Sequence, residues 1–235
     1  MISAIILAGG LGTRLRQEVP DLPKPMAPIN GKPFLEHLIT YWNSQGISHF
    51  HLSLGYMHEK IQNYFGNKFN NASISYSIEE TPVGTGGGLK LSLNDISSGE
   101  NFLLLNGDTF FKIPLKKIIK FHLDNNLCMT LNLFQFNESN RYGEVILDEF
   151  SSVTGLKPKS ESTIGYANGG VYMINKNKIY NIFKHFEKEK ISFESDIIPH
   201  LIFNDFKVKA LKFNKPFLDI GIPKDYRYAN IFFNN

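Results

Sequence analysis

The sequence predicts a Rossmann-like α/β fold, with a mostly parallel central sheet and a small mixed β/α elaboration. Apolar, strand-like runs alternate with helical stretches through the first half of the chain, which is typical of successive βα units. The first of these runs, Ala4 to Ala8, leads directly into glycines. After Arg141 the strand-like runs come closer together, which indicates hairpins and mixed pairing. We therefore expect the second half of the chain to pack on the same sheet as the first.

Apolar periodicity and turn residues predict the elements in order. After the strand at Ala4 to Ala8, a helix begins at Pro33, whose fixed φ suits a first helical turn, and Gly46 closes it. Further strands are predicted at residues 50–54, 74–78, 102–105, 128–134, 144–147, 153–156 and 166–174. Further helices are predicted at residues 59–65, 89–96, 115–124, 192–203 and 224–233.

Length and composition are those of an ordinary globular protein. With 235 residues the chain is long enough for one sizeable core, so residues 1–235 are expected to form a single domain. Hydrophobic residues at 42% and charged residues at 20% exclude the disordered and fibrous classes. The net charge of +3 comes from scattered Lys and Arg, without the basic stripe that would neutralise the phosphates of a duplex. Nucleic acid is therefore not an expected partner.

The N-terminus and the cysteine usage indicate a cytoplasmic protein. The chain begins with a short apolar run that lacks a preceding basic region, so no signal peptide is predicted. No stretch reaches membrane-spanning length, and no membrane partner is expected. The single cysteine, Cys128, lies in an apolar run and is expected to be a buried, inert thiol, in keeping with a reducing compartment.

A glycine-rich loop follows the first strand, in the order Leu7-Ala8-Gly9-Gly10-Leu11-Gly12-Thr13-Arg14-Leu15. Glycines allow backbone N–H groups to approach an anion without interference from Cβ, so the loop predicts a phosphate site. It is not a Walker A loop, because no Gly-Lys-Ser/Thr follows. It also fails the dinucleotide fingerprint, because Leu15 stands where the third glycine is required.

A second segment, Pro23-Lys24-Pro25-Met26-Ala27-Pro28, follows the loop, and the two together closely resemble the signature of the sugar-1-phosphate nucleotidyltransferases. Asn106 to Phe111 adds to the likeness, which is greatest to the members that transfer GMP to D-glycero-D-manno-heptose 1-phosphate. The resemblance implies a nucleotidyltransferase fold with a sugar-binding elaboration. It also implies catalytic roles on the phosphates for Arg14 and Lys24. The nucleotide would be lined by Leu7, Ala8, Gly9, Gly10, Gly12 and Thr13.

Two aspartates are candidate ligands for Mg²⁺. A buried strand delivers Asn106-Gly107-Asp108 to its carboxyl end, the edge at which open α/β sheets bind ligands. Asp219, in Leu218-Asp219-Ile220-Gly221, resembles the family's second metal-binding aspartate. Magnesium usually takes one or two protein carboxylates together with phosphate oxygens and water. Ile222 departs from the pattern, because relatives commonly carry Thr there.

The segment from Thr81 to Gly87 resembles the family loop that packs against the base and ribose. It implies nucleotide contacts from Gly84 and Thr85, and from Gly107 of the metal motif. A carboxylate can accept hydrogen bonds from both guanine N1–H and the exocyclic amine, which either Glu79 or Glu80 could do. Period-2 alternation aligns Glu80 with the apolar residues of the preceding strand, so Glu80 is the predicted nucleotide contact.

Three residues are expected at the sugar phosphate. Gly143 and Asn168 lie in segments that resemble those approaching the sugar, and Lys159 corresponds to a family lysine. Relatives carry Glu beside that lysine, whereas this chain has Pro158, and a two-residue gap would put Lys157 in the place of Lys159. The segment Ser192 to Asp196 resembles a further sugar-side segment, and helix capping by Ser192 explains it equally well.

The expected reaction joins an NTP, with GTP favoured, to a sugar 1-phosphate and releases pyrophosphate. The sugar phosphate is already ionised and needs no general base, and histidines such as His37, His51 and His122 are expected on helix or strand surfaces. One alternative is a mannose 1-phosphate or other hexose 1-phosphate substrate. The alternatives from other classes are a dinucleotide-dependent oxidoreductase and a catalytically silent nucleotide sensor. A homodimer is left open, because the sequence does not determine the oligomeric state.

Overall fold

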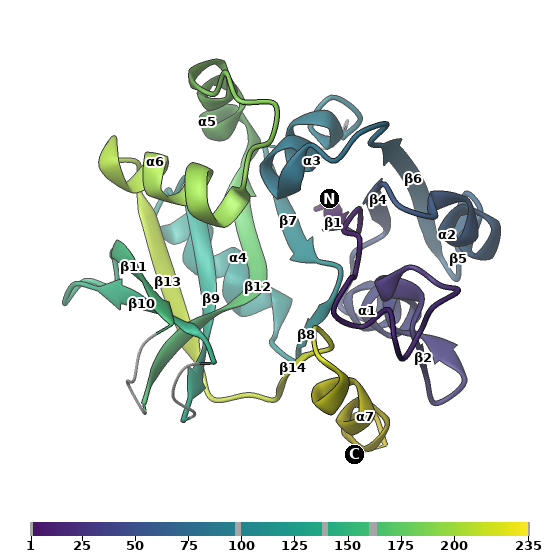
Figure 1. The fold of residues 1–235 in the computed structure, drawn as a ribbon. Coiled ribbons are helices and arrows are strands. Elements are labelled where there is room, and N and C mark those ends of the chain that lie inside the picture. Colours follow the sequence, from purple (N-terminus) through teal and green to yellow (C-terminus); the bar gives the residue numbers. More distant parts are fainter. Residues whose placement is uncertain (1, 97–99, 138–140, 160–163, 235) are drawn as a thin grey trace.

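The computed structural model describes residues 2–96, 100–137, 141–159 and 164–234, with the backbone alone at Lys159. Its centre is an eight-stranded sheet with the strand order β13-β9-β12-β7-β1-β4-β6-β5 (Figure 1). In chain order these strands are β1 Ala4–Leu7, β4 His49–Leu54, β5 Lys68–Phe69, β6 Ala72–Ile78, β7 Asn101–Asn106, β9 Met129–Phe136, β12 Gly165–Asn175 and β13 Val208–Phe213.

Within the central sheet, four of the seven strand pairs are parallel, in agreement with the predicted mostly parallel sheet. Strand β1 pairs in parallel with β4 and β7, β4 pairs with β6, and β9 pairs with β13. Strand β12 runs antiparallel to both of its neighbours, and the short β5 is antiparallel to β6. Three two-stranded sheets complete the β structure: β10 Gly143–Leu147 with β11 Val153–Lys159, β8 Thr109–Phe111 with β14 Phe217–Asp219, and β2 Pro28–Ile29 with β3 Lys32–Pro33. The mixed second half that the sequence predicted is confirmed.

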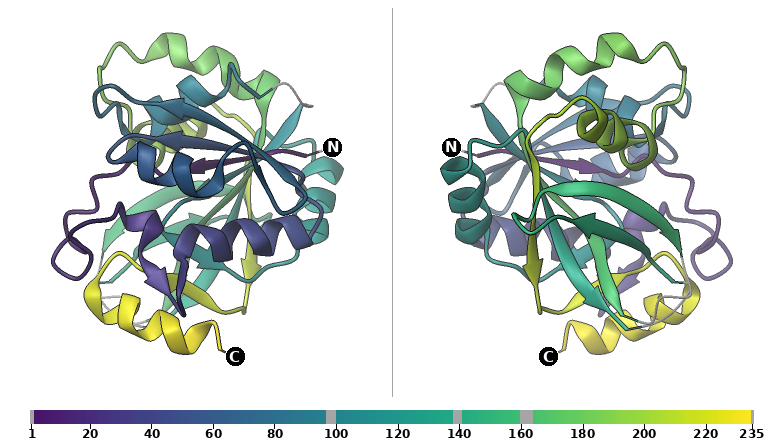
Figure 2. Two further views of the ribbon diagram at one scale, coloured as in Figure 1. Left: turned by 90° about the vertical axis from the view of Figure 1, so that its right-hand side faces the viewer. Right: turned by 90° about the vertical axis from the view of Figure 1, so that its left-hand side faces the viewer.

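Two hydrophobic clusters cover the two faces of the sheet. The buried strand β1 shows why, because Ala4 and Ile6 belong to one cluster and Ile5 belongs to the other. Helices α1 Phe34–Ser44, α2 His58–Phe65 and α4 Leu115–Asp124 pack in the first cluster. Helices α3 Gly84–Ser92, α5 Lys176–Tyr180 and α6 Ile198–Phe203 pack in the second. Helix α7 Pro223–Phe232 lies at the opposite end of the molecule from α5 (Figure 2).

Two differences from the predicted elements concern the site. The helix expected at residues 89–96 begins five residues earlier, at Gly84, so the predicted base loop is partly the first turn of α3. Strand β13, with the sequence Val-Lys-Ala-Leu-Lys-Phe, was not predicted and forms the edge of the sheet beside β9. The strands predicted at residues 50–54, 74–78, 102–105, 128–134, 144–147, 153–156 and 166–174 are present, with ends shifted by at most three residues.

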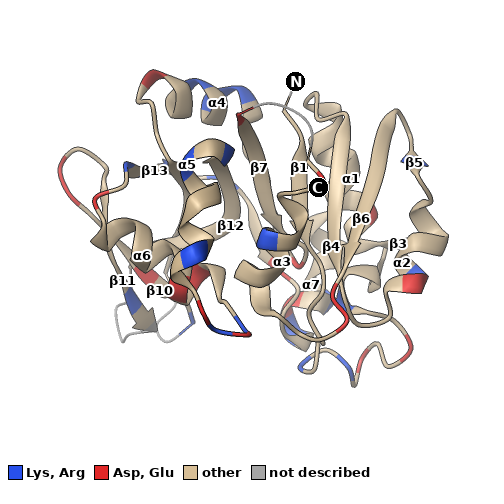
Figure 3. Cartoon of the chain, turned by 90° about the horizontal axis from the view of Figure 1, so that it is seen from above, with Lys and Arg blue, Asp and Glu red and all other residues tan. Residues whose placement is uncertain are grey.

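Charged residues are spread over the molecule. Lys and Arg lie on many elements and are interspersed with Asp and Glu, as the view from above shows (Figure 3). Within the described ranges, none of the helices has the length and apolar character needed to cross a membrane.

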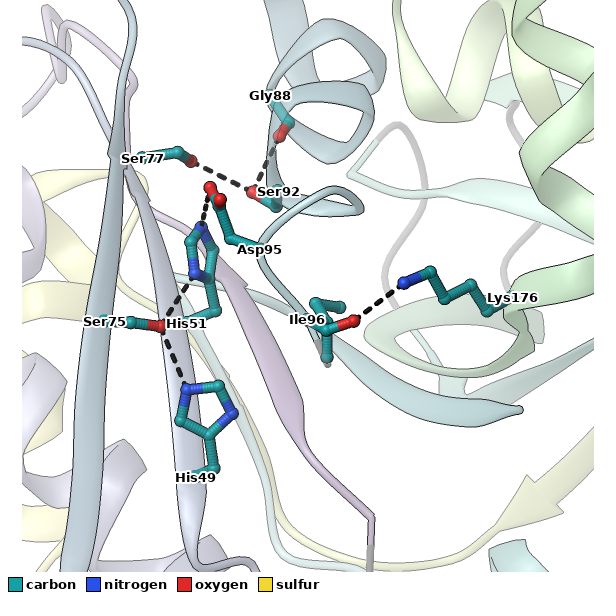
Figure 4. A network of polar contacts seen from close by, with 9 residues as sticks. All are labelled: His49, His51, Ser75, Ser77, Gly88, Ser92, Asp95, Ile96 and Lys176. Atoms are coloured by element: carbon teal, nitrogen blue, oxygen red, sulfur yellow. Dashed lines mark hydrogen bonds and ion pairs between the residues drawn. The ribbon is translucent and has the colours of Figure 1, made fainter. Parts of the chain in front are cut away.

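Buried polar groups lie between the sheet and α3, where the sequence predicted a surface histidine. His51 is fully buried, and its Nδ1 lies 2.8 Å from Ser75 Oγ, which also contacts His49 Nε2 at 2.9 Å (Figure 4). His122 is 2% exposed and lies between Thr130 and Asn101. The prediction that His51 and His122 lie at the surface was therefore wrong. His51 is on β4 and His122 is on α4, and each of these elements buries its polar face against another element.

Stability should depend on pH through these two histidines. Burial lowers the pKa of His51 and of His122 to about 4, whereas an unfolded histidine titrates near its usual value of about 6.5. The unfolded chain binds more protons between these values, so the free energy of unfolding should fall as pH falls from about 6.5 towards 4. Each histidine contributes a slope of up to about 1.4 kcal/mol per pH unit.

Urea unfolding at a series of pH values tests this. The variant His51→Asn should show a shallower slope than the wild type, and the exposed His185 offers a control, His185→Asn, that should keep the wild-type slope. Equal slopes for all three proteins would contradict the burial argument.

Candidate active site

The carboxyl ends of the adjacent strands β1 and β7 form the floor of the site. Leu7 is in register with Asn106, and Gly107 N donates to Leu7 O at 2.9 Å. A Cβ at Gly107 would lie 2.6 Å from Leu7 O, so only glycine lets the two strand ends approach so closely. This contact brings Asp108 against the beginning of the glycine loop. It is the strand-end position at which the sequence predicted ligand binding.

A cavity of about 440 Å³ opens above these strand ends. The structure brings most of the predicted nucleotide residues together around it. Its wall includes the predicted residues Leu7, Ala8, Gly9, Gly10, Gly12, Thr13, Arg14, Lys24, Gly84, Thr85, Gly107 and Asp108. It also includes Leu11, Pro25, Glu79, Pro82, Asn106, Phe193, Glu194 and Gly221.

Gly12 joins the two parts of the predicted motif. Its φ of +59° lies in the left-handed region, and a Cβ on it would lie 2.9 Å from Lys24 Cβ. A side chain at this position would therefore be strained and would push the short 3₁₀ turn Lys24–Met26 away from the loop. Glycine at position 12 allows Lys24 and Arg14 to line the same cavity.

Lys24 and two aspartates meet at one end of the cavity. Lys24 Nζ lies 2.5 Å from Asp108 Oδ2, and the lysine side chain is only 10% exposed. Asp219 comes from β14, which pairs with β8 directly after Asp108, and its Oδ1 accepts from Gly221 N at 2.6 Å. A Cβ on Gly221 would meet both Asp219 Oδ1, at 2.7 Å, and Lys24 Nζ, at 3.3 Å. Three groups from distant parts of the chain thus converge.

Two carboxylates and two cationic side chains interact in this cluster. Burial raises the pKa of Asp219, and the charge of Asp108 raises it further, whereas Lys24 and Arg14 lower it. Lys24 therefore pairs directly with Asp108, whereas Asp219 interacts with both Lys24 and Arg14 through their charges. Among the described residues no group of three or more His, Cys, Asp or Glu side chains is placed to hold a metal ion. A cation at this end would have two protein carboxylates as ligands and would need others from a substrate or water.

The carboxylate that lies beside Gly9 on the cavity wall is that of Glu79, and not that of the predicted Glu80. Glu79 N continues the strand ladder by donating to Leu54 O, and its Oε2 accepts from Val83 N at 3.3 Å. Glu80 is exposed and is absent from the cavity wall. The reason is that α3 and the cavity lie on the polar face of β6, which carries Ser77 and Glu79, and not on the face that carries Ile74.

The glycines of the predicted base loop serve close packing. Gly86 N and Gly87 N donate to Ile191 O, and a Cβ on Gly84 would lie 2.5 Å from that oxygen. Thr85 Oγ1 accepts from Phe193 N at 2.8 Å. The start of α3 is thereby held against the one-turn π-helix Phe193–Ile197, which brings Phe193 and Glu194 to the cavity.

The predicted sugar residues are only partly brought to this cavity. Asn168 Nδ2 donates to Tyr172 Oη at 2.5 Å and to Glu194 Oε1 at 3.3 Å, so it reaches the cavity through Glu194. Gly143 begins β10 and packs on Lys157 O, outside the cavity wall. The side chain of Lys159 lies outside the described part of the chain. Asp219 lines a second cavity of about 380 Å³, whose basic side chains are Arg141, Lys215 and Lys224.

Comparison with known proteins agrees with this arrangement. The family model for nucleotidyl transferases matches residues 3–235. The chain belongs to the nucleotidyl transferase family.

Several relatives of this nucleotidyl transferase cover nearly its whole length. It is 45% identical to a D-glycero-α-D-manno-heptose 1-phosphate guanylyltransferase from Aneurinibacillus thermoaerophilus. The 229 aligned residues cover 97% of this chain and 96% of that protein. The corresponding values for the enzyme of that name from Campylobacter jejuni are 42%, 96% and 97%. The crystal structure of HddC from Yersinia pseudotuberculosis has a TM-score of 0.86 at 35% identity, covering 99% of this chain and 100% of that one. A second HddC structure, complexed with GMP-PN, has a TM-score of 0.84 with the same identity and coverage.

Sequence reasoning about this nucleotidyl transferase missed some of the residues that line the cavity. Asn106 and Pro82 lie within the motifs but had no predicted role, although Asn106 adjoins Gly107 and Pro82 lies two residues from Gly84. Phe193 and Glu194 belong to a segment that helix capping explained equally well. Ser192 Oγ does accept from Ser195 N, so the predicted capping is confirmed, and Phe193 and Glu194 of the same segment line the cavity.

Proposed function

We propose that this nucleotidyl transferase transfers GMP from GTP to D-glycero-α-D-manno-heptose 1-phosphate, forming a GDP-heptose and releasing pyrophosphate. The observation that carries the proposal is one cavity lined by the glycine loop, with Lys24 and Asp108 close to Gly12 and the Glu79 carboxylate close to Gly9. The two relatives with 45% and 42% identity bear the name of this activity. One nucleotidyltransferase domain spanning residues 1–235 is part of the proposal.

The chemistry would need alignment and charge neutralisation rather than a general base. An oxygen of the sugar phosphate is ionised at neutral pH and attacks the α-phosphorus of GTP. The P–O bond to pyrophosphate then breaks in line with this attack. The backbone of Gly9 and Gly10 can approach the phosphates, and the charges of Arg14 and Lys24 can neutralise them. Such groups act best when they stabilise charge that develops in the transition state.

The cluster of Asp108 and Asp219 fits a magnesium ion. Both offer carboxylate oxygens. Burial, and after it the charge of Asp108, raises the pKa of Asp219, and a bound cation would offset both effects. This donor set matches the preference of Mg²⁺ for one or two carboxylates with phosphate oxygens. When bound, the ion would neutralise phosphate charge. The chain's own carboxylates would hold it beside Lys24.

The variants Lys24→Ala and Arg14→Ala should each lower kcat more than they raise KM for GTP. Each removes a positive charge that is expected to stabilise the phosphates mainly in the transition state, and the loss should be about 100- to 1000-fold in kcat. Lys24→Ala should have the larger effect, because it also leaves Asp108 and Asp219 without their buried partner. Steady-state kinetics with pyrophosphate detection measures both parameters. A change confined to KM would show that these residues bind only the ground state.

A matrix of nucleoside triphosphates against sugar 1-phosphates, read by pyrophosphate release, tests the proposed reaction. GTP with D-glycero-α-D-manno-heptose 1-phosphate should be the fastest pair. A preference for mannose 1-phosphate would leave the enzyme class intact and change the acceptor. Release of no pyrophosphate with any pair would indicate the nucleotide sensor instead, and turnover of a nicotinamide dinucleotide would indicate the oxidoreductase.

Small molecules are the proposed partners, and the cytoplasm is the proposed location. Support for the location comes from Cys128, which is free and buried, as expected for a thiol that is not part of a disulfide framework. Burial raises its pKa to about 12, so the thiol is unreactive at neutral pH. A homodimer remains open as the assembly.

A further inference from the structure

Ser53 is a buried serine on β4 with no role in the reaction described above. Its side chain is 1% exposed and points into the layer between the sheet and α3. Its hydroxyl makes no hydrogen bond of good geometry with any residue in the described ranges. A buried hydroxyl without a partner costs free energy, so its neighbours indicate what it serves.

The neighbour of Ser53 is the carboxylate of Glu79. A Cβ added to Gly88 would meet Ser53 Oγ at 2.6 Å and Glu79 Oε1 at 2.8 Å, so all three positions adjoin one another beneath α3. Gly88 thus leaves the space in which the hydroxyl and the carboxylate face each other. A hydroxyl in this place can donate to the carboxylate and favour its ionised form. Burial raises the pKa of Glu79, and Ser53 lowers it.

The hydrogen-bonding capacity of Glu79 matches its proposed ligand. An ionised carboxylate has about four lone-pair positions, two on each oxygen. Val83 N occupies one on Oε2, and Ser53 faces Oε1. One position on each oxygen then remains, and guanine presents two parallel donors, N1–H and the exocyclic amine. A carboxylate that rotated away from this orientation would lose one of the two contacts.

We propose that Ser53 is a positioning residue that determines the selectivity for guanine by orienting the Glu79 carboxylate and favouring its ionised form. The inference rests on the proposed function, in which Glu79 reads the base. It adds to the residues that determine base selectivity one that touches no substrate and lies on β4, whereas Glu79 follows β6. The other ionisable side chains on the cavity wall are Arg14, Lys24, Asp108 and Glu194, and the layer beneath α3 also holds His49, His51 and Asp95.

The variant Ser53→Ala tests the inference through nucleotide choice. The ratio of kcat/KM for GTP to that for ATP should fall by about tenfold, the loss expected when a hydrogen bond to a charged group is removed. Because GTP and ATP carry the same triphosphate, titration of the phosphates cancels in this ratio. As the solution is acidified, the ratio should decline in both proteins because Glu79 becomes protonated. In Ser53→Ala this decline should occur at a higher pH, because Glu79 has lost a group that favours its charge.

Ser77→Ala is the matched control. Ser77 lies in the same layer, on β6, but its hydroxyl contacts Ser92 Oγ at 3.2 Å (Figure 4). This variant should keep the wild-type ratio and its pH dependence. Ser53→Cys keeps a weak donor and should give an intermediate ratio, and it carries the test if Ser53→Ala does not fold.

The outcomes separate this inference from the function on which it rests. If the wild type does not prefer GTP, or if Glu79→Gln leaves the preference unchanged, the reading of guanine by Glu79 fails. If Glu79→Gln relaxes the preference while folded Ser53→Ala keeps both the ratio and its pH dependence, the role of Ser53 alone is overturned. Equal losses in Ser53→Ala and Ser77→Ala would also overturn it, because they would show a general loosening beneath α3.

Discussion

Replacing Asp108 by asparagine is expected to lower kcat by at least about 1000-fold while the protein stays folded. The amide keeps the size of the side chain but removes the charge that pairs with Lys24 and that we propose to hold magnesium beside Asp219. A loss of this size corresponds to about 4 kcal/mol, the upper end of the cost of removing one electrostatic stabiliser from a transition state. The dependence of the rate on magnesium concentration should shift to higher concentrations for any residual activity.

Single-turnover kinetics and a thermal melt measure these effects. Asp124→Asn is the matched control, because Asp124 also pairs with one lysine, Lys120 at 2.7 Å, but lies exposed on α4. It should keep wild-type activity. Near-normal turnover in folded Asp108→Asn would refute the assignment of this carboxylate to the metal.

Replacing Glu79 by glutamine should reduce the preference for GTP over ATP by about 10- to 100-fold. The physical reason is the loss of a charge-assisted, bidentate pair at a partly desolvated site, worth roughly 1.5 to 3 kcal/mol. Glutamine offers one acceptor oxygen where the carboxylate offers two, and its amide nitrogen opposes a guanine donor. The burial that raises the pKa of Glu79 also shows that the carboxylate is removed from bulk water.

Values of kcat/KM for GTP, ATP, CTP, UTP and dTTP test this, with Glu80→Gln as the matched control. Glu80 is the next residue, carries the same charge and is exposed, so its variant should keep the preference. If Glu80→Gln alone relaxed the preference, the prediction from strand alternation that Glu80 contacts the base would be correct. A wild-type preference for UTP or dTTP would refute guanine as the base.

The residues of the phosphate end were predicted from the sequence because they lie in short, contiguous segments. Glycines directly after a strand allow its backbone N–H groups to approach an anion, and the loop carries Arg14 only a few residues further on. Asp108 follows its strand directly, so the edge of the sheet at which it lies could be predicted from chain order alone. The alternation of strands and helices was sufficient for the fold class for the same reason, since each unit depends on neighbouring residues.

The tertiary structure alone decided which face of a strand serves the site. Alternation along β6 was read correctly, but helix α3 packs on the polar face, so Glu79 rather than Glu80 reaches the cavity. For the same reason His51, expected at the surface, is fully buried, and Ser53 lies beside Glu79. Asp219 meets Asp108 only because β14 pairs with β8 across more than a hundred residues of chain. Sequence patterns determine how side chains alternate, whereas burial and charge coupling depend on which element lies on each face, and that is decided by packing between distant segments.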